Sequence, residues 1–234
     1  MSNKLRPADI AKRLKISTSS LRNYEARGMV PPPKRLSTGY RVYTEEHVAY
    51  FECIVAMSPG FGMEITSIVL KSIQLKDLDS ALWIINKAQA AIYEDKKTTE
   101  KAITMLENMI KEQFRMEKYM TIGSISTKTQ IPASALRYWE KEGLITSIRD
   151  KNNNYRLFDR FQMIKILLMK TTKNAVYSQE IMQLKKAMKN LDGGDFNKAK
   201  IIVSDIQKQL NKRNQEQLYG LFHFYRLCEM LNLY

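Results

Sequence analysis

Apolar residues recur near the start of this chain with the spacing of short amphipathic helices. Ile10 and Leu14 lie four residues apart, which puts both on one face of a helix over about residues 8–14. Ser17-Thr18 then supplies N-cap hydroxyls for a second helix over about residues 18–27. Two helices joined by so short a turn are typical of a helix-turn-helix.

A β-hairpin and two more helices are predicted to follow. Gly28 stands where a left-handed C-cap would end the second helix. Two short extended segments then flank a turn in which Gly39 permits a positive φ. The apolar pattern predicts a third helix over about residues 45–57 and a fourth over about residues 61–72.

The same pattern occurs twice. A shift of 115 residues aligns residues 7–57 with 122–172 without a gap, and nine of the 51 positions are identical. In the second copy Pro132 falls in a first helical turn, Gly143 follows the second helix, and Asn152–Asn154 tolerate the positive φ of the turn. The identical pairs are Ile10/Ile125, Ile16/Ile131, Ser19/Ser134, Leu21/Leu136, Arg22/Arg137, Glu25/Glu140, Gly28/Gly143, Tyr40/Tyr155 and Arg41/Arg156. The chain is therefore interpreted as a tandem duplication, residues 1–119 and 120–234.

Each copy ends in a long helical tail with a polar middle. In the first tail, apolar residues at spacings of three, four and seven or more form a near-heptad seam interrupted at residues 94–101. The second tail has a polar stretch at residues 211–217 and then an aromatic end. One helix with a polar middle and a hairpin of two helices both fit this pattern. The seam residues are Leu82, Ile85, Ile92, Ile103, Leu106, Ile110 and Phe114, and Ile201, Ile202, Ile206 and Leu210.

The fold class predicted is mainly α, with two winged helix-turn-helix domains, each with a small β-hairpin wing and a coiled-coil-like tail. The segments expected are 1–76 and 120–192 for the heads and 77–119 and 193–234 for the tails. The tails are expected to pack antiparallel within one molecule as a pseudo-dimer; a homodimer with four heads is the alternative. The expected seam joins Leu82, Ile85, Ile103 and Leu106 to Ile202, Ile206, Phe222 and Leu218.

Charge points to a polyanionic partner. The 234 residues carry a net charge of +14, and the pI is about 9.6. Residues 1–57 and 120–172 each have a net charge of +5, whereas residues 58–119 are neutral. Two matched basic heads favour nucleic acid over a merely solvated surface. The 44% apolar content excludes whole-chain disorder.

Composition also bears on compartment and chemistry. The two cysteines, the lack of an apolar leader and the short apolar runs predict a cytoplasmic protein with no membrane partner. His47 and His223 are isolated, and neither Cys53 nor Cys228 has a neighbour at metal-ligand spacing. We therefore expect no enzyme activity, no metal and no cofactor.

The motifs resemble the MerR family of bacterial transcriptional regulators, whose pattern is L-R-Y-Y-E-x-x-G-L-(L/I/V) followed by a wing ending in G-Y-R-x-Y. The first copy has L-R-N-Y-E at residues 21–25 and G-Y-R-V-Y at 39–43. The second has L-R-Y-W-E at residues 136–140 and N-Y-R-L-F at 154–158. Asn23 and Trp139 depart from the family's tyrosine pair, so the heads are expected to bind DNA unequally. Family chains normally carry one head each, so two heads in one chain is the larger departure.

The resemblance makes the second helix of each head the recognition helix. Arg22 and Arg137 lie early in it, where a guanidinium can hold a phosphate or a guanine with two hydrogen bonds. The alternative is an ion pair with Glu25 or Glu140, three residues on. Thr18, Ser19 and Ser134 either contact DNA or only cap their helices.

The remaining candidates lie on the same helices and on the wings. Tyr24 and Tyr138 resemble the family's phosphate-contacting tyrosines, with core rings as the alternative. Arg41 and Arg156 are expected to face outward to phosphate, or else to be solvated strand charges. The candidate DNA-binding residues are Thr18, Ser19, Arg22, Tyr24, Lys34, Arg35, Tyr40, Arg41, Ser134, Arg137, Tyr138, Lys141, Arg149, Tyr155 and Arg156.

The function predicted is a sequence-specific double-stranded DNA-binding transcriptional regulator. The resemblance implies a pseudo-palindromic promoter site, distortion of that site, and RNA polymerase as a further partner. The alternative is an architectural or recombination-accessory DNA-binding protein. The aromatic residues Tyr219–Tyr225 are interpreted as core against the other tail, with a small-molecule effector site as the less favoured possibility.

Overall fold

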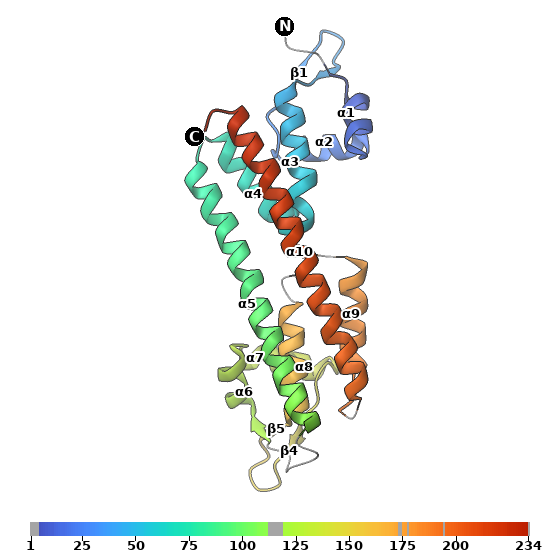
Figure 1. The fold of residues 1–234 in the computed structure, drawn as a ribbon, viewed down its shortest axis with the longest axis vertical. Coiled ribbons are helices and arrows are strands. Elements are labelled where there is room, and N and C mark those ends of the chain that lie inside the picture. The colour runs from blue at the N-terminus through green and yellow to red at the C-terminus, as the bar shows by residue number, and fades with distance from the viewer. Residues whose placement is uncertain (1–4, 112–118, 173–174, 177, 194, 234) are drawn as a thin grey trace. The chain divides into compact units, whose positions relative to one another are not determined.

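The structure is a computed structural model that describes residues 5–111, 119–172, 175–176, 178–193 and 195–233 (Figure 1). The first copy contains α1 (Pro7–Leu14), α2 (Thr18–Ala26), β1 (Lys34–Arg35), β2 (Arg41–Val42), α3 (Glu45–Phe61), α4 (Met63–Gln74) and α5 (Leu78–Lys111). The second contains β3 (Met120–Thr121), α6 (Ile122–Thr129), α7 (Ala133–Lys141), β4 (Ile148–Arg149), β5 (Arg156–Phe158), α8 (Arg160–Thr171), α9 (Gln179–Lys189) and α10 (Phe196–Met230). The predicted fold class is confirmed.

The helix ends in the heads follow the predicted local chemistry closely. The Ser17 hydroxyl accepts a hydrogen bond from the Ser20 amide at 3.0 Å and so caps α2. Gly28 and Gly143 both have φ +67°, the left-handed conformation expected after the recognition helix. Pro132 occupies the N-cap position of α7, one residue before the first turn in which it was expected.

The wings are antiparallel hairpins. In the first head β1 pairs with β2, and in the second β4 pairs with β5. Gly39 (φ +80°) and Asn154 (φ +59°) occupy the positive-φ positions of the two turns, as predicted. A third strand was not predicted: Met120 pairs with Phe158 between β3 and β5.

Each tail is a single helix over its described residues, which settles the alternative that the sequence left open. Helix α5 has 34 residues and α10 has 35, and both run through their polar middles. In α5 this stretch is stabilised locally, because Lys97 pairs with Glu94 and Lys96 with Glu100 at helical spacing. Phe114, expected in the seam, lies outside the described residues. No helix in the described part of the chain has the length and apolar character needed to cross a bilayer.

The chain forms two compact units, and each combines one head with tail residues from both copies. Unit 1 comprises residues 1–91 and 211–234. Its core joins Phe51 and Ile54 of α3 to Ile85 of α5 and to Phe224 and Leu227 of α10. In Figure 1 the last turns of α10, in red, run beside α3 and α4. The first head is therefore covered by the tail of the second copy.

The predicted seam is only partly right in unit 1, where Ile85 does pack in one core with residues of α10. Leu218 and Phe222 are 71% and 55% exposed, and Leu82 is 41% exposed. The inward face of α10 carries Phe224 and Leu227 instead. The predicted seam chose residues on a neighbouring face of the same helix, which the apolar pattern alone did not exclude.

Unit 2 comprises residues 92–210 and has two apolar clusters. The smaller cluster forms the interior of the second head. The larger one packs α8 and α9 against both tails. Here Leu106, Ile202 and Ile206 belong to one cluster and Ile103 packs against it, as the predicted seam requires. The division into heads 1–76 and 120–192 and tails 77–119 and 193–234 stays a prediction.

Two glycines bring α3 and α10 into close contact within unit 1. A Cβ on Gly60 would lie 2.5 Å from the backbone nitrogen of Gln217, and one on Gly220 would lie 2.9 Å from Cα of Met57. The Gln217 side chain donates a hydrogen bond to the Gly60 carbonyl at 3.2 Å, and Arg213 donates to the same oxygen at 3.0 Å. Backbone atoms cannot move aside as a flexible side chain can, so this helix crossing requires glycine at both positions.

We expect Gly60→Ala and Gly220→Ala each to lower the free energy of unfolding by about 1–3 kcal/mol, the usual cost of overpacking. Urea denaturation followed by circular dichroism measures the change. Gly123→Ala is the control, because its Cβ would meet only the Thr121 hydroxyl at 4.0 Å. That substitution should be neutral or stabilise α6 by up to about 1 kcal/mol. Equal destabilisation in all three variants would contradict the close-contact explanation.

Candidate nucleic-acid interface

The recognition helices present an arginine from each head to solvent. Leu21 and Leu136 are fully buried and fix the inner faces of α2 and α7. The next residues, Arg22 and Arg137, are exposed, and neither has an ion pair or hydrogen bond within the described part of the chain. The side chains expected to meet DNA first are therefore accessible.

The alternative partner for these arginines, the glutamate three residues on, is bound elsewhere. Glu25 accepts a hydrogen bond from Nε of Arg41 at 2.8 Å. Glu140 accepts one from Nε of Arg156 at 2.6 Å. The same ion pair thus ties the wing to the recognition helix in both heads. The prediction that the wing arginines simply face outward is wrong, because each is half-buried against its glutamate.

Further hydrogen bonds reinforce both pairs. The Tyr43 hydroxyl donates to Glu25 at 3.3 Å, and the Ser147 hydroxyl donates to Glu140. Burial alone would raise the pKa of the Glu140 carboxyl, but the hydrogen bonds from Ser147 and Arg156 outweigh it and the pKa is lowered. The carboxylate is therefore the form that the folded head stabilises.

In the second head several candidates gather around one hollow of about 340 Å³. Arg137 comes from α7, while Arg149, Tyr155 and Arg156 come from the wing. Arg149 donates a hydrogen bond to the Asn154 carbonyl at 3.0 Å, which holds its guanidinium beside the wing turn. The guanidinium groups of Arg137 and Arg149 on one hollow suit an anion such as a phosphate, while that of Arg156 is held by Glu140.

The first turn of α6 also lines this hollow, and none of its residues was among the predicted candidates. Thr121, Ile122 and Gly123 line it, and the Thr121 hydroxyl caps the helix by accepting from the Ser124 amide at 3.3 Å. A helix N-terminus adds backbone N–H donors and a partial positive charge. Thr121 directly before the apolar Ile122 is an N-cap pattern that could have located this helix start from the sequence.

The other candidates divide by exposure. Tyr40, Tyr138 and Tyr155 are 73%, 59% and 62% exposed. Tyr24 is half-buried against the core of the first head, which raises its pKa and fits the core-ring alternative. The Ser19 hydroxyl hydrogen-bonds to that of Ser17 at 2.6 Å, and Thr18 is half-buried. The exposed side chains that remain are Lys34, Arg35, Ser134 and Lys141.

The aromatic end of α10 is not the core that its pattern predicted. Phe224 is buried, but Tyr219, Phe222 and Tyr225 are 60%, 55% and 49% exposed. His223 packs between two of these rings, with centroids 4.8 Å from Tyr219 and 5.3 Å from Phe222. These three exposed rings therefore lie on the surface of unit 1. Among the described residues, no group of three or more His, Cys, Asp or Glu side chains is arranged to hold a metal ion.

Comparison with known proteins matches both heads to one family. Residues 6–43 and residues 121–158 each match the MerR family regulatory protein. Each copy of the repeat therefore contains a segment similar to the MerR family. The two matches cover the two helices and the wing of each head and leave the tails unmatched. No solved structure was found to match the chain.

The similar proteins found include several that are named HTH-type transcriptional regulators. The HTH-type transcriptional regulator CueR of Salmonella typhi is 36% identical over 58 residues, 24% of this chain and 42% of that protein. The HTH-type transcriptional regulator AdhR of Bacillus subtilis is 38% identical over 58 residues, 24% of this chain and 41% of that protein. The chain thus spans less than half the length of these relatives.

The glutamate–arginine pair makes stability depend on pH. Because the pKa of Glu140 is lowered on folding, its stabilisation is present at neutral pH and is lost as the pH falls through the folded-state value. We expect Glu140→Gln to cost about 1 kcal/mol of unfolding free energy at pH 7, since the pair is partly exposed. The difference from the parent protein should shrink towards about pH 3, below the ordinary glutamate pKa of about 4.3.

Chemical denaturation at the two pH values measures this change. Glu142→Gln is the matched control, because that neighbouring glutamate is exposed and has no ion pair or hydrogen bond within the described part of the chain. It should alter stability little at either pH. A Glu140→Gln deficit that stays constant down to pH 3 would show that the charge of Glu140 is not what stabilises the wing.

Proposed function

We propose that this chain is a double-stranded DNA-binding transcriptional regulator whose two heads contact one pseudo-palindromic promoter site. The observation that carries the proposal is the hollow in the second head, which Arg137, Arg149 and Arg156 line together with the first turn of α6. The similarity of both copies to the MerR family supports it, because the relatives found are transcriptional regulators by name.

In this proposal, α2 and α7 enter the major groove and the wings contact the flanking backbone. Arg22 and Arg137 hold a guanine edge or a phosphate through two parallel hydrogen bonds. Arg41 and Arg156 position the wing through their glutamates. The hollow beside α6 binds a backbone phosphate, where the helix N-terminus and the guanidinium groups act together.

The two heads are proposed to bind unequally, so that the preferred site is an imperfect palindrome with one half favoured. The recognition helix exposes Asn23 in the first head and Tyr138 at the same position in the second. An amide and a phenol present different hydrogen-bonding groups to a groove. By analogy with the MerR family, the proposal also includes distortion of the promoter by this chain and its contact with RNA polymerase.

One chain is proposed to supply the two heads that family members obtain by pairing chains. The composition of the units supports this arrangement, because the core of unit 1 includes Phe224 and Leu227 from the second tail. The larger core of unit 2 includes Ala102 and Leu106 from the first tail. Each head therefore has its tail contact without a second chain.

DNA binding is expected to be electrostatic and to depend on the recognition arginines. Between 50 and 200 mM salt the affinity should fall roughly 10³- to 10⁵-fold if about six to ten phosphates are neutralised. Arg22→Ala and Arg137→Ala should each cost about 1–3 kcal/mol in binding to the preferred site. Fluorescence anisotropy with a labelled duplex measures both effects.

The matched control is Arg226→Ala, because Arg226 is exposed on α10 and lies over the ring of Phe222. Its affinity for DNA should stay within about twofold of the parent protein. A flat salt dependence would refute the DNA-binding function. Tight binding to any duplex, equally weakened by every arginine substitution, would favour the architectural alternative.

Sedimentation equilibrium at micromolar protein tests the one-chain arrangement. We expect the mass of one chain, and one chain per duplex when a single preferred site is added. Residues of both copies in one chain are linked at an effective concentration of about millimolar, which a partner at micromolar concentration cannot match. A mass of two chains in both conditions would establish the homodimer with four heads instead.

A further inference from the structure

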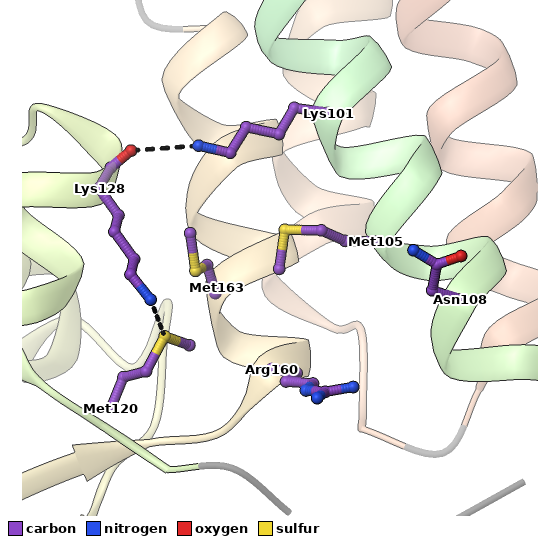
Figure 2. A pocket seen from close by; sticks show the side chains of 7 residues that line it. All are labelled: Lys101, Met105, Asn108, Met120, Lys128, Arg160 and Met163. Carbon is purple, nitrogen blue, oxygen red and sulfur yellow. Dashed lines mark hydrogen bonds between the residues drawn. The ribbon is translucent and has the colours of Figure 1, made fainter. Parts of the chain in front are cut away.

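A second hollow in unit 2 has a different lining from the proposed DNA-binding surface. It measures about 520 Å³ and lies among the second half of α5, the strand β3, and the helices α6 and α8 (Figure 2). This volume falls in the range of small-molecule sites, about 300–1,000 Å³. The lining residues are Lys101, Met105, Asn108, Met120, Lys128, Arg160 and Met163.

The lining combines thioethers with cations. Figure 2 shows Met105, Met120 and Met163 projecting towards the same space from three different elements. Methionine side chains are unbranched and adaptable, so they accommodate flexible apolar groups. The charged side chains of the lining are two lysines and an arginine, and none of the described lining residues is acidic. The site therefore favours an apolar body that carries a negative charge.

The two lysines make only weak contacts that a ligand could replace. The Lys101 ammonium donates to the Lys128 carbonyl at 3.4 Å, near the outer limit of a hydrogen bond. The Lys128 ammonium lies 3.7 Å from the sulfur of Met120, a weak acceptor. Both are drawn as dashed lines in Figure 2. A carboxylate or phosphate would be a much stronger acceptor for either ammonium.

In the first copy, the residue equivalent to Lys128 is paired with acidic side chains. There Arg13, which corresponds to Lys128, forms an ion pair with Glu52 at 2.8 Å and lies 3.7 Å from Glu45. In the second copy Arg160 replaces Glu45, and Leu167 replaces Glu52. Both acidic partners are thus lost at equivalent positions, and one becomes a cation.

The apolar positions change with the charges. Met120 takes the place of Leu5, and Met163 takes the place of Val48. Two shorter or branched side chains are therefore replaced by two adaptable ones at the same hollow. Leu167 belongs to the larger core of unit 2, so packing explains the loss of one glutamate, whereas Arg160 in place of Glu45 changes the charge of the hollow itself.

We propose that this hollow binds an amphipathic anion, with a carboxylate or phosphate at Lys101 and Lys128 and an unbranched apolar chain along the three methionines. The proposal goes beyond the proposed function, because binding is measured without DNA. If the chain is a regulator, such a ligand is its effector, seated where the tail helix α5 meets the second head. Loss of the ligand site and loss of DNA binding are therefore separate results.

Calorimetric titration of the full chain with twelve-carbon probes below their micellar concentrations tests the proposal. Dodecanoate and dodecyl phosphate supply the two head groups, and the tighter of them identifies the preferred anion. We expect dodecanol to bind at least about tenfold more weakly, since it lacks the charge-assisted hydrogen bonds. Dodecyltrimethylammonium, which carries the opposite charge, should bind no better than dodecanol.

Substitutions locate the site. Lys101→Gln and Lys128→Gln should each weaken binding of the preferred anion about tenfold. Lys200→Gln is the matched control, because Lys200 is exposed on α10 in the same unit and lines no part of the hollow. Met105→Glu places an acid among the methionines and should abolish binding. Far-UV circular dichroism and urea denaturation check that each variant is folded.

Methyl-labelled methionine spectra provide a second readout that does not depend on any variant. The resonances of Met105, Met120 and Met163 should shift with the anion, while those of Met29 and Met57, buried in the core of unit 1, should not. No binding of either anion would overturn the proposal. Equal binding of the ammonium probe, full affinity in both lysine variants, or shifts confined to other methionines would overturn it as well.

Discussion

Each head buries part of its apolar surface against a tail segment from the other copy, and the rest of the structure depends on this exchange. Helix α3 carries Phe51 and Ile54 on a face that α1 and α2 do not cover alone, and α10 covers it with Phe224 and Leu227. A short helical domain without such a cover would leave a large apolar patch in water. Each of the long helices α5 and α10 accordingly contributes residues to the cores of both units.

Duplication preserved the frame of the head while its surface diverged. The left-handed glycines after the recognition helices and the glutamate–arginine pair to the wing occur in both copies with the same geometry. The changes lie outside this frame, at the recognition position Asn23/Tyr138 and at the ion pair Arg13–Glu45, whose second-copy counterparts are both cations. In a symmetric dimer of identical chains, a substitution changes both heads at once. In this chain the two heads have separate sequences, so each can change without the other.

The features that could be predicted from the sequence are those determined by residues close together in the chain. The head helices, Gly28, Gly143 and the turn at Asn154 follow from caps, periodicity and steric limits on φ, and all of them were found. The inward face of α10 in unit 1 was missed because the rotation of α10 is fixed by the close contact of Gly60 with Gln217, residues more than 150 positions apart. The partner of Glu25 was missed for the same kind of reason: it lies 16 positions away, on the wing, and not on the same helix. Both hollows need residues from three or more elements, which no local pattern brings together.

The ion pairs also determine how the charge of each head is used. Glu25 and Glu140 lie within the recognition helices, where a free carboxylate would repel a phosphate beside Arg22 or Arg137. By accepting a hydrogen bond from the wing arginine, each glutamate neutralises a charge of the wing and keeps its own carboxylate partly buried. Partly buried pairs are screened by salt much less than exposed charges are. Raising the salt concentration therefore weakens the contacts of the exposed arginines with a polyanion well before it loosens the wing from the recognition helix, so the surface that binds remains assembled when it is unoccupied.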